Sequence, residues 1–208
     1  MADIEKRFLE LAIDLKALLF GEFTLKSGRE SLYFFNIATF LESGHLGELA
    51  EMYSEKITEC NIDYDVIFGP SYKGIPLAAA VATVLNQKAS KKIPICFDRK
   101  EKKDHGEGGT LVGSVTNKKV LIIDDVLTAG TALKSSIKLI QEAGGTISGA
   151  IIALDRQEQD EGEQVCKKLE NELNIPIFSI SSLENLIVYL ENTNQKDIVK
   201  KLKSSFKS

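Results

Sequence analysis

Apolar residues recur with helical spacing at the start of this chain. Five of them, from Ile4 to Leu18, follow one another at steps of four and three residues, which predicts an amphipathic helix over residues 4–19. Residues 20–42 carry short aromatic runs, which predict short strands and turns. A second helix is predicted over residues 45–60.

Beyond residue 60 the pattern changes to short apolar runs that alternate with segments of helical length. The runs predict strands at residues 66–68, 93–97, 120–123, 150–154 and 177–180. The intervening segments predict helices over residues 75–85, 131–143 and 163–173, and two more helices close the chain. This alternation indicates βαβ units with right-handed crossovers. We therefore expect an α/β fold with a mainly parallel sheet that binds ligands at the carboxyl ends of its strands.

The composition is that of a globular chain with an acidic balance. It has 208 residues, 43% of them hydrophobic and 27% charged, with a formal net charge of −4. The length predicts a single domain over residues 1–208. The acidic balance disfavours nucleic acid as a partner. The longest mostly apolar run, residues 77–85, is too short for a membrane span, and the amino terminus lacks an apolar signal core, so we expect a cytoplasmic protein.

Cysteine and histidine residues do not support a disulfide framework or a transition-metal site. Cys60, Cys96 and Cys166 are odd in number and form no CxxC pair. The two histidines, His45 and His105, would need further ligands from elsewhere to hold zinc. Metal chemistry is therefore better suited to a hard cation that arrives with its substrate.

The nine residues after the predicted strand at 120–123 are the strongest candidate site. They read DDVLTAGTA, residues 124–132, so two carboxylates meet a strand end and two threonines and a glycine open a helix. The free N–H groups and partial positive charge of a helix N-terminus suit a phosphate. Adjacent carboxylates would repel a phosphate, but they suit neighbouring hydroxyls or the cation of a metal–polyphosphate. The combination favours a sugar phosphate with free cis-hydroxyls.

Two common phosphate-binding motifs are absent from this segment. The chain has no GxxxxGK[ST] loop, and no GxGxxG follows a strand. The alternative is a simple polar turn with Thr131 as a helix cap. We favour the functional interpretation because the whole string, and not an isolated Asp-Asp pair, follows a strand.

The string VLIIDDVLTAGTA, residues 120–132, resembles the phosphoribosyl-pyrophosphate (PRPP) signature of the type I phosphoribosyltransferases. Up to about Arg156, the chain resembles the orotate-using branch of that family. The resemblance implies a five-stranded parallel core sheet over roughly residues 60–180, with a small hood from residues 1–42 and part of the C-terminal region. It also implies Mg²⁺-assisted transfer of ribose 5-phosphate from PRPP to orotate, which gives orotidine 5′-phosphate and pyrophosphate in pyrimidine (UMP) biosynthesis.

The resemblance also assigns residues to the two substrates. The PRPP site takes Lys26, Tyr72, Lys73, Arg99, Lys100, Lys103, His105, Asp124, Asp125, Val126, Leu127, Thr128, Ala129, Gly130, Thr131 and Ala132. The orotate site takes Phe34, Phe35, Thr128 and Arg156. The catalytic candidates are Lys103, His105, Asp124 and Asp125. Mg²⁺ is expected to bind through PRPP and pyrophosphate, so no protein ligand is assigned to it.

The base-binding residues each have a structural alternative. A planar pyrimidine suits flat apolar contacts, but Phe34 and Phe35 are neighbours, and strand alternation sends neighbouring side chains to opposite faces. At least one of them is therefore expected in the core, and a base contact could come through the main chain. The guanidinium of Arg156 can bind the orotate carboxylate with two parallel hydrogen bonds. A solvated arginine at a strand end is the alternative.

Two polar segments are expected to contact the pyrophosphate. Residues 69–76, GPSYKGIP, form a rigid turn that presents Lys73. Residues 99–109 contain no apolar side chain and several cations, which is typical of a long loop that orders over a polyanion. In the family such a loop is partly supplied by the neighbouring subunit, so a homodimer is expected.

Two rival functions remain at this point. A purine-specific relative is disfavoured by the hood segment and by Arg156. A PRPP-sensing regulator would need a nucleic-acid surface, which the acidic balance weakens. The predicted partners are therefore orotate and PRPP, with no nucleic acid and no membrane.

Overall fold

The structure is a computed structural model that describes residues 1–25, 28–88, 92–103, 109–128 and 130–205. For residues 100–103, 109 and 205 it describes the backbone alone. Within these described ranges no helix is long and apolar enough to cross a membrane.

A six-stranded sheet forms the centre of the molecule, with strand order β10-β7-β6-β3-β4-β5. Its five parallel strands are β3 (Val66–Gly69), β4 (Ile95–Lys103), β6 (Lys119–Leu127), β7 (Thr146–Asp155) and β10 (Ile177–Ser182). All five were predicted from apolar runs, which confirms the expected mainly parallel α/β sheet. The sixth strand, β5 (Gly109–Val112), is antiparallel to β4 and was not predicted.

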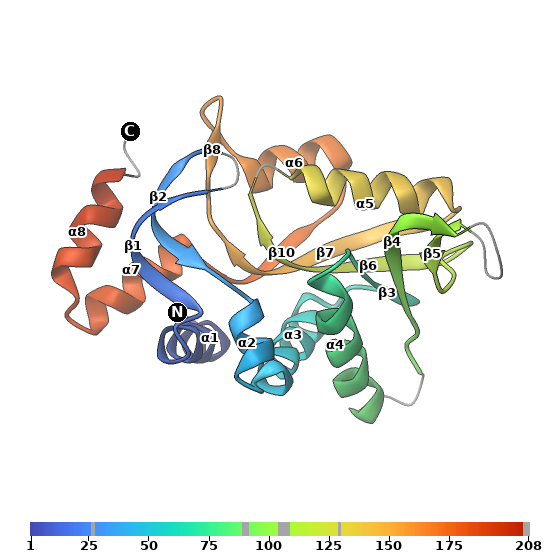
Figure 1. Ribbon diagram of the computed structural model, residues 1–208, viewed down its shortest axis with the longest axis horizontal. Coiled ribbons are helices and arrows are strands. Elements are labelled where there is room, and N and C mark those ends of the chain that lie inside the picture. Colours follow the sequence, from blue (N-terminus) through green and yellow to red (C-terminus); the bar gives the residue numbers. More distant parts are fainter. Residues whose placement is uncertain (26–27, 89–91, 104–108, 129, 206–208) are drawn as a thin grey trace.

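Helices cover both faces of this sheet (Figure 1). One face carries α5 (Thr131–Glu142) and α6 (Val165–Leu173), and the other carries α3 (Leu46–Cys60) and α4 (Gly74–Lys88). Side chains alternate across β6, so Val120 and Ile122 pack with the first pair of helices, whereas Leu121 and Ile123 pack with the second. The middle of the sheet is thus buried on both faces, which is why its strands contain short, mostly apolar runs.

The amino-terminal and carboxy-terminal segments lie together beyond one end of the sheet (Figure 1). They comprise α1 (Asp3–Asp14), the antiparallel hairpin of β1 (Leu18–Thr24) and β2 (Glu30–Phe35), α2 (Ala38–Glu42), α7 (Leu183–Asn192) and α8 (Lys196–Ser205). A small hairpin of β8 (Gln159–Asp160) and β9 (Glu163–Gln164) precedes α6.

The first predicted helix was too long. It ends at Asp14, because Lys16 takes a left-handed conformation with φ 58° and the chain turns into β1. Leu18 matches the helical spacing but is the first residue of that strand, and it is buried there. Periodicity alone cannot separate these cases, since a buried strand residue and a buried helix residue are equally apolar.

The predicted loop over residues 99–109 was also too long. β4 continues to Lys103 and pairs back onto β5, with Phe97 opposite Val112 and Lys103 opposite Gly109. Strand pairing satisfies backbone N–H and C=O groups whatever the side chains are, so a fully polar segment can still form a hairpin. Residues 104–108 lie outside the described part of the chain.

Phe34 and Phe35 provide a direct test of how the two faces of β2 are packed. Phe35 is buried against the rings of Phe8 and Phe40, with centroid distances of 5.8 and 6.3 Å, whereas Phe34 is 38% exposed and contacts the ring of Phe23. Phe35→Ala should lower the free energy of unfolding by about 3–5 kcal/mol. Phe34→Ala, the matched control, should lower it by about 1 kcal/mol. Urea denaturation followed by circular dichroism measures both, and equal losses would contradict this packing.

Candidate active site

The acidic pair stands on β6 itself and not in the turn that was predicted after Ile123. The strand continues to Leu127, because β7 pairs with it as far as Leu127 opposite Asp155. On its other side, the pairing with β3 ends at Ile122. Asp124 and the residues after it therefore lie where the sheet has opened on one side. Such an opening at the carboxyl end of a parallel sheet is where ligands bind.

The two carboxylates are held by their own backbone and by one lysine. The amide of Asp125 donates to Oδ1 of Asp124 at 2.9 Å, and the amide of Val126 donates to Oδ1 of Asp125 at 2.9 Å. Lys73 Nζ lies 3.4 Å from Oδ2 of Asp125. Burial, and then repulsion from Asp125, raises the pKa of Asp124 to about 7. The pair can thus accept hydrogen bonds from hydroxyl groups, and it favours a ligand that brings positive charge or hydroxyl donors.

The turn between β6 and α5 forms a small cavity beside this pair. The cavity has a volume of about 210 Å³ and is lined by Asp124, Val126, Leu127, Thr128, Thr131 and Ala132, among others. Gly130 precedes α5 with φ 73°, a left-handed conformation, and an added Cβ there would lie 2.3 Å from Cδ1 of Leu169. The structure therefore brings the predicted phosphate-binding segment together at the N-terminus of a twelve-residue helix.

A second turn, between β3 and α4, borders the same edge of the sheet. Asp98 on β4 accepts hydrogen bonds from the amide of Ser71 at 2.7 Å and from its hydroxyl at 2.6 Å. These bonds fix the turn, and Lys73 extends from it to Asp125. Tyr72 is 64% exposed. Lys73 thus lies beside the acidic pair, and Asp98 is a supporting residue that the sequence did not single out.

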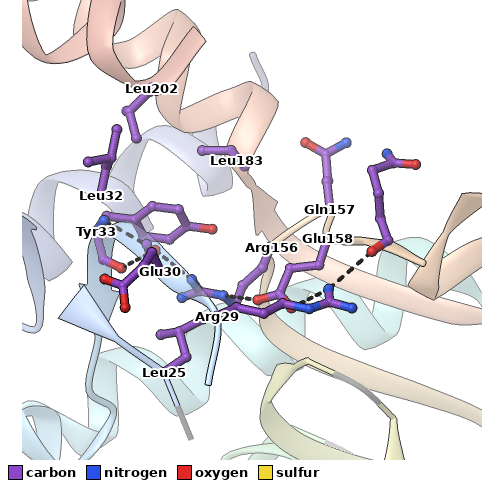
Figure 2. A pocket seen from close by; sticks show the side chains of 12 residues that line it. Leu25, Arg29, Glu30, Leu32, Tyr33, Arg156, Gln157, Glu158, Leu183 and Leu202 are labelled. Carbon is purple, nitrogen blue, oxygen red and sulfur yellow. Dashed lines mark hydrogen bonds and ion pairs between the residues drawn. The ribbon is translucent and has the colours of Figure 1, made fainter. Parts of the chain in front are cut away.

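Arg156 lies directly after β7 and lines a cavity of about 330 Å³ (Figure 2). Although it is an arginine, it is only 6% exposed. Its Nη2 donates to Oγ of Ser31 at 2.8 Å, its Nε donates to Oε1 of Glu158 at 2.7 Å, and its guanidinium lies 4.4 Å from the ring centroid of Tyr33. Ser31 and Tyr33 come from β2, so this arginine connects the hairpin to the sheet. The alternative of a solvated arginine is wrong.

Comparisons with known proteins agree with this geometry. The family model for the phosphoribosyl transferase domain matches residues 42–181. An orotate phosphoribosyltransferase of Pseudoalteromonas translucida is 47% identical over 198 residues, 95% of this chain and 92% of that protein. Another, from Marinobacter nauticus, is 50% identical over 193 residues, 92% of this chain and 91% of that protein. The chain belongs to the orotate phosphoribosyltransferase family.

A solved structure supports the membership of this family over the whole length. The crystal structure of the Francisella tularensis orotate phosphoribosyltransferase has a TM-score of 0.85 and 39% identity, and the match covers 99% of this chain and 96% of that chain. A more distant adenine phosphoribosyltransferase of Leishmania donovani, at 16% identity and a TM-score of 0.59, shares the fold. The resemblance drawn from residues 120–132 is confirmed, and so is the expected class of enzyme, a phosphoribosyltransferase of the glycosyltransferase class.

The two phenylalanines assigned to orotate in this family lie on opposite faces of β2. Phe35 is 5% exposed and packs in the hydrophobic core, so only its main chain is available to a base. Phe34 keeps an exposed ring on the other face. The expectation that at least one of the pair is a core residue is confirmed.

Several residues assigned to PRPP cannot be placed by their side chains. Lys26, His105 and Ala129 lie outside the described residues, and Lys100 and Lys103 are described only as backbone positions of β4. Arg99 is placed on the same strand. Its Nη1 atom is buried and has no hydrogen-bond partner among the side chains that the structure describes.

Other residues at the site were not found from the sequence. Glu158 accepts hydrogen bonds from both Arg156 and Arg29, the latter at 3.3 Å, and Arg29 also donates to the carbonyl of Gln159 at 3.0 Å. Ser31 and Tyr33 complete the surroundings of Arg156. Strand alternation places Tyr33 on the same face of β2 as Phe35. This alternation was the one sequence signal that could have pointed to Tyr33 as a buried residue. Glu158 lies only two residues from Arg156, whereas its contact with Arg29 joins residues 129 positions apart and left no local pattern.

Replacement of Gly130 should test the close packing of the phosphate turn. Gly130→Ala combines a left-handed φ with the contact to buried Leu169, and should lower the free energy of unfolding by about 3 kcal/mol. The control Gly44→Ala has φ 80° but no atom within 4 Å of the added Cβ, so it isolates the backbone effect. That effect should be about 1 kcal/mol. Equal losses in urea denaturation would contradict the steric argument.

The raised pKa of Asp124 predicts how stability depends on pH. Because the folded-state pKa, about 7, exceeds the ordinary value of 3.8, the folded protein holds the proton more tightly than the unfolded chain does. The stability that this tighter proton binding at Asp124 contributes is therefore complete at low pH and is lost as the pH rises through 7. Relative to Asp124→Asn, the ligand-free wild type should lose up to about 1.4 kcal/mol of unfolding free energy per pH unit between pH 5 and 7. Parallel stability curves for the two proteins would refute this.

Proposed function

We propose that the chain catalyses the Mg²⁺-dependent reaction of orotate with PRPP, which gives orotidine 5′-phosphate and pyrophosphate. The observation that carries this proposal is the pairing of Leu127 with Asp155. It sets the segment that starts at Thr128 beside Arg156, so a phosphate-binding turn and a carboxylate-binding arginine leave adjacent strands at the same edge. A sugar phosphate and an acidic base could then lie next to each other.

The PRPP side of the site would be formed by β6 and the turn after it. The amides and hydroxyls of Thr128 and Thr131 would hold the 5′-phosphate at the start of α5. Asp124 and Asp125 would accept hydrogen bonds from the ribose hydroxyls. As the anomeric bond breaks, positive charge develops on the ribose ring, and the nearby carboxylates would stabilise it.

The leaving pyrophosphate needs cations around it. Lys73 already lies beside Asp125, and its amino group would move to the pyrophosphate when PRPP enters. We assign the same role to Tyr72 and to the residues that the family pattern selects, namely Lys26, Arg99, Lys100, Lys103 and His105. Lys103 and His105 are the proposed catalytic members of this group. Closure of the 99–109 segment over PRPP would also exclude water, which would otherwise hydrolyse the activated sugar.

The carboxylates of this edge fit a magnesium ion that enters with its substrate. Among the described residues no group of three or more histidine, cysteine, aspartate or glutamate side chains could hold a metal by itself. Mg²⁺ commonly binds through one or two carboxylates and substrate phosphates, and Asp124 and Asp125 offer such oxygens. When bound, the ion would neutralise charge on the pyrophosphate.

The orotate side of the site would be formed by Arg156 and the hairpin. Arg156 contacts Ser31 and Glu158 through Nη2 and Nε, and neither contact uses Nη1. The guanidinium is thus oriented before the base arrives, and its unused end would bind the orotate carboxylate. Thr128, the main chain of Phe35 and the ring of Phe34 are the other proposed base contacts.

The cellular role and assembly are also part of the proposal. The product would enter pyrimidine nucleotide (UMP) biosynthesis in the cytoplasm. The enzyme would act as a homodimer in which the 99–109 segment is shared between subunits. Each chain would be one domain, with a core over residues 60–180 and a hood formed by residues 1–42 and part of the carboxy-terminal region. The names of the similar proteins support the assigned pathway, and the resemblance drawn from the sequence motivates the other points.

The proposed function is tested by pyrophosphate release from PRPP. Purified protein with Mg²⁺ should release pyrophosphate only when orotate is present, and removal of Mg²⁺ with a chelator should stop the reaction. Adenine, hypoxanthine and uracil serve as alternative bases. Turnover with one of these in place of orotate would reassign the substrate.

Arg156→Lys should separate the two substrate sites. Lysine keeps the charge but loses the planar pair of donors, so the KM for orotate should rise about 10- to 100-fold. The KM for PRPP should stay within about twofold, since the phosphate turn is unchanged. The control Arg7→Lys, on α1 and paired with Glu55, should change neither value. An unchanged KM for orotate would exclude Arg156 as the carboxylate ligand.

A further inference from the structure

β6 loses one of its two neighbouring strands immediately before the acidic pair. β3 pairs with it only as far as Phe68 opposite Ile122, whereas β7 continues to Leu127 opposite Asp155. The start of α4 comes close at the next residue, since a Cβ on Gly74 would lie 3.2 Å from the carbonyl oxygen of Ile123. From Asp124 onward the strand must therefore be held on that side by something other than a strand.

Tyr53 provides that support from α3, in the helical layer that packs on one face of the sheet (Figure 1). It lies in the middle of α3, it is 0% exposed, and its hydroxyl donates a hydrogen bond of 2.7 Å to the main-chain carbonyl of Asp124. A carbonyl removed from water without a partner is costly, so this part-buried bond satisfies a main-chain acceptor just beyond the end of the β3 pairing. The bond joins residues 71 positions apart in sequence and links the helical layer to the active-site edge.

The tyrosine hydroxyl keeps its proton in this position. Burial, and then the negative charges of Asp125 and Asp124, raise the pKa of Tyr53 well above its ordinary value. The protonated hydroxyl is thus the donor in the contact to the carbonyl of Asp124.

Hydrogen bonds link the position of the Asp124 carbonyl to the positions of both carboxylates. The side chain of Asp124 accepts from the amide of Asp125, and the side chain of Asp125 accepts from the amide of Val126. Each carboxylate is thus fixed to the backbone one residue further along. A shift of the peptide that follows Asp124 would move both carboxylates together.

We propose that Tyr53 is a positioning residue for PRPP, which acts by holding the Asp124–Asp125 segment of β6 where β3 no longer supports it. This inference rests on the proposed function, because it takes the acidic pair as the ligand of the ribose hydroxyls. Tyr53 itself touches no substrate. Its effect should therefore appear on the sugar side of the reaction and not on the base side.

Tyr53→Phe removes only the hydroxyl and tests this proposal by initial-rate kinetics. The KM for PRPP should rise about five- to tenfold, and the KM for orotate should stay within about twofold. The matched control is Tyr64→Phe, the same change at a half-buried tyrosine before the amino end of β3, which should change neither value. Tyr53→Met, which fills the space with a flexible apolar side chain, is the second variant and should give the same split if Tyr53→Phe folds poorly.

A double-mutant cycle shows whether Tyr53 acts through the carboxylates. With Asp125→Asn already present, Tyr53→Phe should raise the KM for PRPP by less than twofold, because the positioned group is already impaired. In a protein that already carries Arg156→Lys, Tyr53→Phe should still raise the KM for PRPP about five- to tenfold.

A purely structural role would lower the melting temperature and leave the KM for PRPP unchanged, and that result would overturn the proposal. Equal rises in both KM values, or full additivity with Asp125→Asn, would also overturn it. The wild type separates this inference from the proposed function. If the wild type fails to use orotate, both fall, whereas an active wild type with an unaffected Tyr53→Phe variant removes this inference alone.

Discussion

Two neighbouring carboxylates repel each other, and the site is organised around keeping them side by side at the end of β6. A buried parallel strand supplies the rigidity, since β7 pairs with β6 beyond the acidic pair to Leu127. Backbone amides of Asp125 and Val126 and the amino group of Lys73 then offset part of the negative charge. Burial, and then the remaining repulsion from Asp125, raises the pKa of Asp124 to about 7. A ligand with hydroxyl groups and an accompanying cation would relieve that repulsion. The phosphate turn follows β6, Lys73 follows β3 and Arg156 follows β7. All three are therefore positioned at the carboxyl edge of the same sheet.

The parallel sheet and the sugar-phosphate edge could be predicted from sequence because their signals are local. Strand segments buried on both faces are mostly apolar, so β3, β6, β7 and β10 each contain a short, mostly apolar run. A ligand site at a strand end must place its polar groups within a few residues of that run, and residues 124–132 do so. The resemblance to a family then supplied the substrate, which spacing alone did not identify.

The features that were missed depend on contacts between distant segments. Polar residues 98–103 form part of β4 because β5 pairs with them, and side-chain composition carries no record of a partner strand. The helix over residues 4–19 was overextended because Leu18 is buried for a different reason than its spacing suggested. Ser31 and Asp98 hold functional groups from remote elements, and a single polar residue of this kind has no sequence signature. Arg156 was found only because its position after a strand matched the family pattern.

The central claim is that the carboxyl end of β6 binds an activated pentose through its acidic pair. It is tested most directly by calorimetric titration of PRPP with Mg²⁺ into ligand-free protein, for the wild type and for the double variant Asp124→Asn/Asp125→Asn. The account predicts one site per chain in the wild type and affinity at least about tenfold weaker in the double variant, equivalent to about 1.4 kcal/mol. Equal affinity in two well-folded proteins, or no binding by the wild type, would contradict it.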